Sequence, residues 1–344
     1  MKPSASGILA ALLSALLFGA STPFAKVLLS EVDPWLLAGL LYLGAGLGLG
    51  LLGLFRNSPR ADLGARDWPW LLAAIAAGGV AGPVLLMIGL AGTPGTSASL
   101  LLNTEGVFTA ALAWFVFREN VDRRIALGMV AIVAGAGVLS WNGSFDVDRL
   151  GPPLAILGAC FCWGLDNNLT RKVSLSDARQ ITTLKGLVAG TTNTGIALAL
   201  GAHVPVASHV LYAAMVGFLG YGVSLALFVR ALRDLGAART SAYFSIAPFV
   251  GAVVAIPLLG EAVTVQLLAA GLLMGVGVWL HLTEVHDHVH SHEAMAHSHA
   301  HVHDTHHQHP HDVMPEGPHV HWHRHEPMRH KHPHYPDAHH RHGH

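Results

Sequence analysis

Two apolar segments decide the fold of this chain: TSASLLLNTEGVFTAALAWFVFRE at 96–119 and RTSAYFSIAPFVGAVVAIPLLGE at 239–261. Each is long enough to cross a hydrocarbon layer of ~30 Å as an α-helix, which takes ~20 residues. When the two segments are aligned by their ends, Glu119 falls opposite Glu261. They therefore predict two copies of one membrane-spanning helix, and with them a duplicated membrane protein.

Apolar stretches of similar length recur along the chain, at 7–29, 34–55, 70–91, 95–117, 124–141, 152–173, 180–200, 208–230, 237–259 and 264–282. Backbone polar groups in lipid must be satisfied within the segment, so each stretch predicts a helix. Five helices per copy is an odd number, so the second copy must enter the membrane upside down. We predict an all-α integral membrane protein of ten transmembrane helices in two inverted five-helix repeats, 7–141 and 152–282.

Composition agrees with lipid as the main solvent. Hydrophobic residues make up 52% and charged residues 12%, about half the charge of a soluble domain. A net charge of −1 leaves no basic surface for a nucleic-acid partner. The first stretch resembles a secretory signal, but its segment FGASTPFAK (18–26) is echoed by WGLDNNLTR (163–171), and a discarded peptide would have no such counterpart.

Basic residues in the short loops give the orientation. The loops that follow the second, fourth, sixth and eighth stretches carry Arg56, Arg60, Arg66, Arg118, Arg123, Arg124, Arg171, Lys172, Arg179, Arg230, Arg233 and Arg239. Lys26 and Arg149 alone lie near the opposite face. We therefore expect a multi-pass protein of the bacterial inner (cytoplasmic) membrane with both termini in the cytoplasm.

Two motifs suggest a family. An aromatic-glycine pair opens each repeat, Phe18-Gly19 and Trp163-Gly164, and an acidic residue closes the fourth helix of each. In these motifs the chain resembles the EamA family of the drug/metabolite transporter superfamily over residues 7–282. The family's usual Glu-Pro is divided here, because Glu105 precedes Gly106 and the second copy has Ala247-Pro248. The resemblance implies a ten-helix fold with a substrate cavity near mid-membrane, mostly for the export of small metabolites.

Three ionisable residues lie within the predicted spans, where an ionised group costs at least ~2.5 kcal/mol. Glu105 lies halfway along its helix and should face a cavity or a partner; the alternative is a protonated acid bonded to a backbone carbonyl or to Asn103. Asp166 and Lys185 lie at equal depth on consecutive helices. An ion pair between them and a snorkelling Lys185 are both open.

Polar side chains extend this zone. Cys162, Asp166 and Thr170 recur at every fourth position and share one helix face, which suits either metal coordination or close helix packing. Asn167 widens the polar face. The residues we predict for the transport pathway are Glu105, Asp166, Asn103, Asn167, Lys185 and Cys162.

The carboxyl-terminal segment has a different chemistry. All but three of the 26 histidines follow residue 285, many of them in His-x-His alternation, and prolines replace aliphatic residues. Such a segment cannot bury a core, so we expect 286–344 to be a disordered cytoplasmic tail. Neutral imidazole binds nickel, cobalt and zinc, and the first predicted ligands are His286, His288, His290, His292, His297, His299, His301 and His303. An idle tail and a pH sensor are the alternatives.

These patterns favour a transporter over an enzyme. The chain has no phosphate-binding loop, so an ion or substrate gradient should supply the energy, and no cofactor is expected. The first hypothesis is export of a divalent transition metal, nickel or cobalt, as in efflux proteins with a histidine-rich tail. The second is export of a small metabolite or amino acid, with the tail as metal buffer or regulator. The expected partners are the lipid bilayer and the transported metal ion or small molecule. A third hypothesis is a membrane-anchored metal store without transport. A homodimer is also left open.

Overall fold

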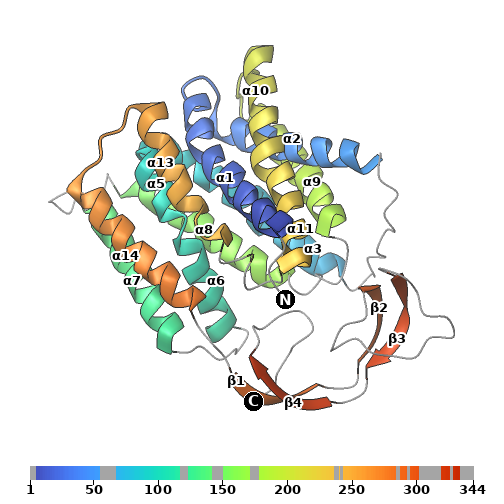
Figure 1. Ribbon diagram of the computed structural model, residues 1–344. Helices are drawn as coiled ribbons and strands as arrows, with labels where there is room; N and C mark the ends of the chain where they lie inside the picture. Colours follow the sequence, from blue (N-terminus) through green and yellow to red (C-terminus); the bar gives the residue numbers. More distant parts are fainter. Residues whose placement is uncertain are drawn as a thin grey trace.

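In the computed structural model the chain is a bundle of long helices followed by short strands (Figure 1). The residues described are 5–54, 67–116, 123–141, 150–170, 178–235, 240, 243–283, 287–292, 295–301, 319–325 and 328–333. The side chains at 54, 178–179 and 232–235, and those of the four strands, lie outside this description.

The first repeat contains four helical rods and one broken rod. In chain order its elements are α1 (Ala5–Leu28), α2 (Pro34–Leu54), α3 (Trp68–Ala74) with η1 (Ile75–Ala81) and α4 (Gly82–Gly92), α5 (Gly95–Leu101) with α6 (Thr104–Phe115), and α7 (Arg123–Ser140). The third rod is continuous through the π-helical η1, whereas the fourth is interrupted between α5 and α6.

The second repeat follows the same plan. Its elements are α8 (Gly151–Thr170), α9 (Ala178–Ala199), α10 (Ala207–Gly217) with η4 (Phe218–Val223) and α11 (Ser224–Leu235), α13 (Ala247–Leu259), and α14 (Val265–Leu282). Its third rod also contains a π-helical segment, η4. Within the described residues the helices thus form ten rods, and their bounds lie close to the predicted spans. Parts of the second, fourth, sixth and ninth spans lie outside the described residues, at 55, 117, 171–173, 237–239 and 241–242.

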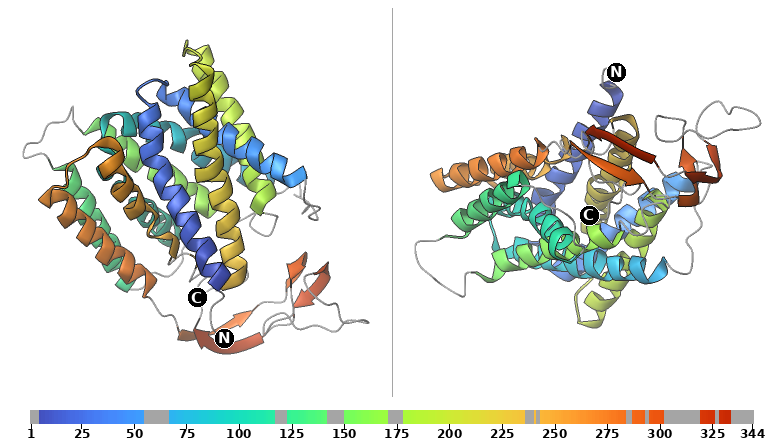
Figure 2. Two further views of the ribbon diagram at one scale, coloured as in Figure 1. Left: turned by 45° about the horizontal axis from the view of Figure 1, so that its top comes forward. Right: turned by 90° about the horizontal axis from the view of Figure 1, so that it is seen from below.

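The two repeats are interleaved. α1 packs against α11 and α13, α8 packs in the equivalent way against α4 and α6, and α2 packs against α9. α7 and α14 lie side by side at one edge in both figures (Figure 2). α1 begins and α14 ends at the same end of the bundle (Figure 1), which we call the terminal end; the opposite end is the distal end.

Glycines allow the closest of these contacts. A Cβ added at Gly186 on α9 would lie 2.8 Å from the Gly46 backbone on α2. A Cβ at Gly190 would lie 2.5 Å from Leu43 N in the same interface. Small residues let helices in lipid approach to backbone contact, which replaces the hydrophobic driving force that water would supply.

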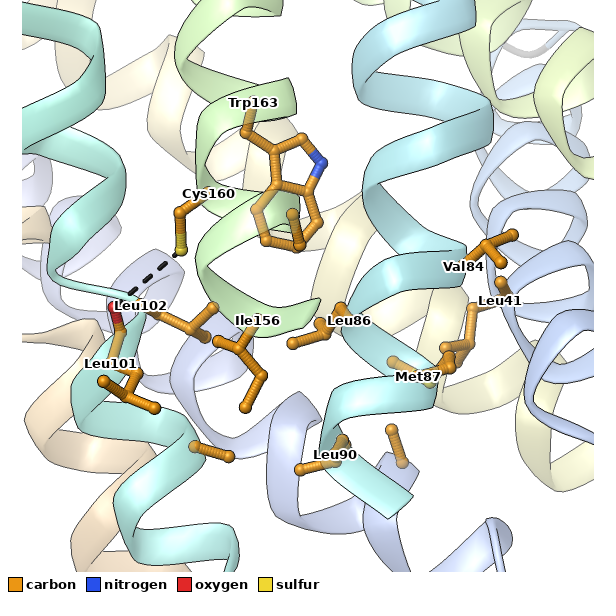
Figure 3. Packing of buried hydrophobic residues seen from close by; sticks show 14 of the residues in the cluster. Leu41, Val84, Leu86, Met87, Leu90, Leu101, Leu102, Ile156, Cys160 and Trp163 are labelled. Atoms are coloured by element: carbon orange, nitrogen blue, oxygen red, sulfur yellow. Dashed lines mark hydrogen bonds between the residues drawn. The ribbon is translucent and has the colours of Figure 1, made fainter. Parts of the chain in front are cut away.

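The apolar core lies where the repeats meet. Ile156 and Cys160 on α8 pack against Leu86 and Met87 on α4 in one buried cluster (Figure 3). The outward faces are apolar as well: Leu272 is 71% exposed and Val130 is 65% exposed. Seven of the helical rods are long and apolar enough to cross a membrane, so lipid is the solvent that suits this surface.

Four short strands follow α14: β1 (Asp287–His292), β2 (Met295–His301), β3 (His319–His325) and β4 (Met328–Pro333). β1 pairs with β4 and β2 with β3, both antiparallel. These strands differ from the disordered tail that we expected. The two-residue period of the His-x-His alternation suits a strand, although a two-stranded ribbon alone is at best marginally stable in water.

The contact between α2 and α9 gives a stability prediction. Gly186→Ala should lower the free energy of unfolding by about 1–3 kcal/mol, because the new methyl group meets backbone atoms that cannot rotate away. Thermal unfolding of the purified protein in detergent measures the effect. The matched control is Gly195→Ala on the same helix, where an added Cβ has no atom within 4 Å. Equal stability of the two variants would contradict the packing described.

Candidate functional site

A break in the fourth rod exposes the first of the site residues. Between α5 and α6 the backbone bonds shorten to the i−3 type, with Asn103 N bonded to Leu100 O at 3.0 Å and Glu105 N to Leu102 O at 3.1 Å. Thr104 Oγ1 donates to Leu101 O at 2.7 Å, so a side chain replaces a lost helical donor. The break places Glu105 in the first turn of α6.

The second repeat has the same irregularity. α13 begins at Ala247, with turn residues before it and Pro248 at its second position, where proline removes a backbone donor. Ala247-Pro248 corresponds to Glu105-Gly106 in the first repeat. Discontinuous helices at equivalent positions of inverted repeats mark the substrate site in many secondary transporters.

Glu105 bonds to a neighbour from the other repeat. Asn167 Nδ2 on α8 donates to Glu105 Oε1 at 2.9 Å and lies 3.3 Å from Thr109 Oγ1. Asn167 is exposed, and Glu105 itself is half-buried. The Glu105 carboxylate has no cationic partner among the described residues, and in this sense we call it open.

Asp166, the residue before Asn167, is paired. Lys185 Nζ on α9 donates to Asp166 Oδ1 at 2.6 Å and to Oδ2 at 2.7 Å. Thr170 Oγ1 donates to the same Oδ1 at 2.7 Å. The side chains are 16% exposed for Lys185 and 11% for Asp166, so the ion pair forms in place of snorkelling.

The ion pair packs against η1. A Cβ added at Gly78 would overlap the Asp166 carboxylate. Gly78 O accepts hydrogen bonds from Trp163 Nε1 at 2.9 Å and from Tyr42 Oη at 3.0 Å. The π-helical segment thus supplies a carbonyl that ties α2 and α8 to the third rod.

Aromatic rings continue from Tyr42 into the second repeat. Tyr42 donates to the carbonyl of Gly78, the residue against which the Asp166 carboxylate packs. Its ring centroid is 5.7 Å from that of Tyr221 in η4, and Phe18 on α1 is 5.8 Å from Tyr221. The central site therefore combines one open carboxylate, one neutralised ion pair and an aromatic surface.

The structure leaves two of the predicted pathway residues outside this group. Asn103 is buried, and its amide donates to Leu100 O at 2.9 Å, so it stabilises the helix break. Cys162 is half-buried on α8, one turn before Asp166. Cys160 Sγ turns to Leu101 O inside the core (Figure 3).

The described residues form no cluster of metal ligands. Across the part of the chain that the structure describes, no three His, Cys, Asp or Glu side chains come together in a group that could hold a metal ion. Of the predicted tail ligands, His286 and His303 lie outside the described residues. The backbone of the other six is in β1 and β2, namely His288, His290, His292, His297, His299 and His301.

Sequence reasoning missed four residues of the site. Tyr42, Gly78, Thr109 and Trp163 carry hydrogen bonds or close contacts there. The signals were weak: a Gly-Gly pair in an apolar run for Gly78, and the aromatic-glycine motif for Trp163. Nothing in the sequence alone indicated Tyr42 or Thr109.

Inverted repeats with paired helix irregularities around a buried polar site define a multi-pass membrane transporter. The model of the EamA-like transporter family matches residues 5–141 and 152–283, so the chain belongs to that family. This confirms the predicted family and the all-α fold of two repeats.

Relatives of this chain are described as transporters. An uncharacterized transporter of Methanothermobacter thermautotrophicus is 28% identical over 295 residues, covering 80% of this chain and 85% of that protein. A probable amino-acid metabolite efflux pump of Salmonella typhimurium is 28% identical over 212 residues, covering 56% and 68%. A solved crystal structure has a TM-score of 0.60 at 17% identity, covering 81% of this chain and 96% of the other, which supports the fold.

The buried ion pair gives a prediction on stability. Asp166→Asn and Lys185→Met should each destabilise the protein by about 3–5 kcal/mol, because each leaves one uncompensated charge in the bundle. The double variant should regain most of this loss, since neither charge remains. Denaturation of the three variants in detergent measures the coupling, and fully additive losses would contradict it.

Proposed function

We propose that this protein is a secondary transporter that exports small metabolites carrying a cationic amine, such as amino acids or their derivatives. The observation that carries the proposal is the open carboxylate of Glu105 at the break in the fourth rod. The nearby Lys185 is paired with Asp166, so Glu105 is an acidic group of the site without a basic partner among the described residues.

The acceptors around Glu105 suit an ammonium group. The Glu105 carboxylate and the Thr109 hydroxyl lie within one helical turn. The Asn167 Nδ2 group lies within hydrogen-bond distance of both. An ammonium group has three donors and needs several acceptors at once. The ring faces of Tyr42 and Tyr221 are also favourable neighbours for a cation or an apolar side chain.

Transport follows from the architecture. In inverted repeats the two halves can exchange conformations about a pseudo-two-fold axis in the membrane plane, so one site can face each side of the membrane in turn. The positive loops of the sequence support an orientation with both termini in the cytoplasm, in a bacterial inner membrane. The relative named as an amino-acid metabolite efflux pump supports export as the direction.

A second candidate is export of nickel or cobalt. The histidine-rich segment after residue 285 supports it, because such a segment can gather these ions at the cytoplasmic side. The geometry of the membrane part favours it less. One carboxylate with amide and hydroxyl groups offers few ligands to replace the water around a divalent ion.

Glu105→Gln should reduce efflux at least tenfold, because it removes a charge-assisted hydrogen bond of about 1.5–3 kcal/mol to the substrate. Cells that express the variant are preloaded with a panel of radiolabelled amino acids and amines, and the release of each is timed. Glu31→Gln, which neutralises an exposed carboxylate between α1 and α2, is the matched control. Release unaffected by Glu105→Gln would contradict the proposed site.

Deleting residues 286–344 separates the two candidates. If metal is the cargo, this deletion and Glu105→Gln should both raise cellular nickel or cobalt and lower the tolerance of the cells to it. If an amine is the cargo, Glu105→Gln should leave metal accumulation unchanged. Elemental analysis of cells grown with nickel, cobalt or zinc gives the readout.

A further inference from the structure

Two charged side chains hold the link between α4 and α5 at the distal end of the bundle. Lys26 Nζ on α1 donates to Leu90 O and Thr93 O, each at 2.7 Å. The Glu261 carboxylate, just after α13, accepts from Gly95 N at 2.5 Å and Thr96 N at 2.8 Å. We call Lys26, Glu261 and the backbone that they bind the distal clasp.

The clasp matches the polarity of the helix ends. The last carbonyls of α4 and the first N–H groups of α5 have no helical partners. A cation at a helix C-terminus and an anion at an N-terminus are the favourable combination. The partners of these carbonyl and N–H groups come from residues far away in sequence. The hydrogen bonds therefore exist only while α1, the α4–α5 link and α13 stay together.

Below the clasp, three helices meet without a gap. A Cβ added at Gly251 on α13 would lie 2.7 Å from Ser99 Oγ on α5 and 2.8 Å from Gly19 O on α1. A Cβ at Gly19 would overlap Ala247 O. α1, α5 and α13 therefore close this end of the bundle by backbone contact.

A pocket of about 640 Å³ borders the clasp. Its lining includes Glu261, Thr96, Ser97, Gln266 and Leu101. Leu101 is 1% exposed, and Glu105 follows it by one turn across the helix break. The pocket thus extends from the clasp residue Glu261 to the end of α5, one turn before Glu105.

The closed arrangement also contains two unsatisfied groups. Thr93 Oγ1 and Ser99 Oγ are both buried without a hydrogen-bond partner. Buried polar groups without partners are unfavourable, so opening to water would relieve this cost while it breaks the clasp. These opposing contributions suit a contact that forms and breaks in each cycle.

We propose that Lys26 and Glu261 are positioning residues of the transport cycle: their clasp keeps the distal gate closed, and the pocket that borders it is the vestibule through which substrate leaves. The inference rests on the proposed transport function. It concerns the access route, which is measurable without knowing the substrate.

The test measures access to Ser99 from outside, because Ser99 is 1% exposed and lies in the contact between α5 and α13. Ser99→Cys is introduced into the full chain with Cys160→Ala and Cys162→Ala, and intact cells are treated with a membrane-impermeant methanethiosulfonate reagent. The cysteine should resist modification while the clasp is intact. Glu261→Gln should raise its modification rate at least tenfold, because an amide can accept at one position and presents N–H groups to a donor at the other.

Lys26→Met provides a second, independent opening of the clasp and should raise the rate similarly. Glu31→Gln, which neutralises an exposed carboxylate at the same end of the bundle, should leave the rate unchanged. An unchanged rate in both clasp variants would overturn the proposal. Failure of both to accumulate in the membrane would also overturn it, because the two charges would then hold the fold. Unchanged efflux in Glu105→Gln would contradict the proposed substrate site. The modification rates would still test the gate.

Discussion

The requirement that backbone hydrogen bonds be satisfied without water governs this structure. It forces the chain into helical rods and allows irregular backbone only inside the protein. The irregular places are η1 and η4 in the third rod of each repeat, and the interruptions that precede α6 and α13 in the fourth. Because each irregularity recurs in the other repeat, we infer that it is a common feature of the repeat.

Side chains supply the hydrogen bonds that these irregularities need. Tyr42 and Trp163 donate to the carbonyl of Gly78 in η1, and Asn193 donates to Gly79 O at 3.1 Å. Asn103 and Thr104 do the same at the interruption of the fourth rod. The polar layer therefore stabilises an unusual backbone, and these backbone bonds do not involve the Glu105 carboxylate.

The spans were predictable because lipid imposes a long apolar run on every helix. The depth of Asp166 and Lys185 suggested their pairing, which the structure shows. The interior of the broken helix was harder to predict. Asn103 and Glu105 are two residues apart, and only the position of the break decides which one faces the site. A π-helical segment shifts the helical phase by a residue, so hydrophobic periodicity did not indicate it.

Long-range polar contacts were the least predictable. Lys26 looked like an isolated basic residue near a helix end, yet it binds carbonyls 64 and 67 positions away in sequence. Glu261 was recognised as the repeat equivalent of Glu119, which lies outside the described residues, but its bonds to Gly95 and Thr96 depend on how the repeats interleave. Sequence patterns describe single helices better than the contacts between them.

The neutral Asp166–Lys185 pair has a consequence for the response of the carrier to membrane voltage. Its two charges move together, so the potential does little net work on the pair when the bundle rearranges. If the protein transports as proposed, an ionised Glu105 would respond to the potential with up to about 2.3 kcal/mol per 100 mV for a full crossing. An ammonium group bound there would cancel this charge on the loaded step. A proton taken up by Glu105 would cancel it on the empty step and would couple transport to the proton gradient.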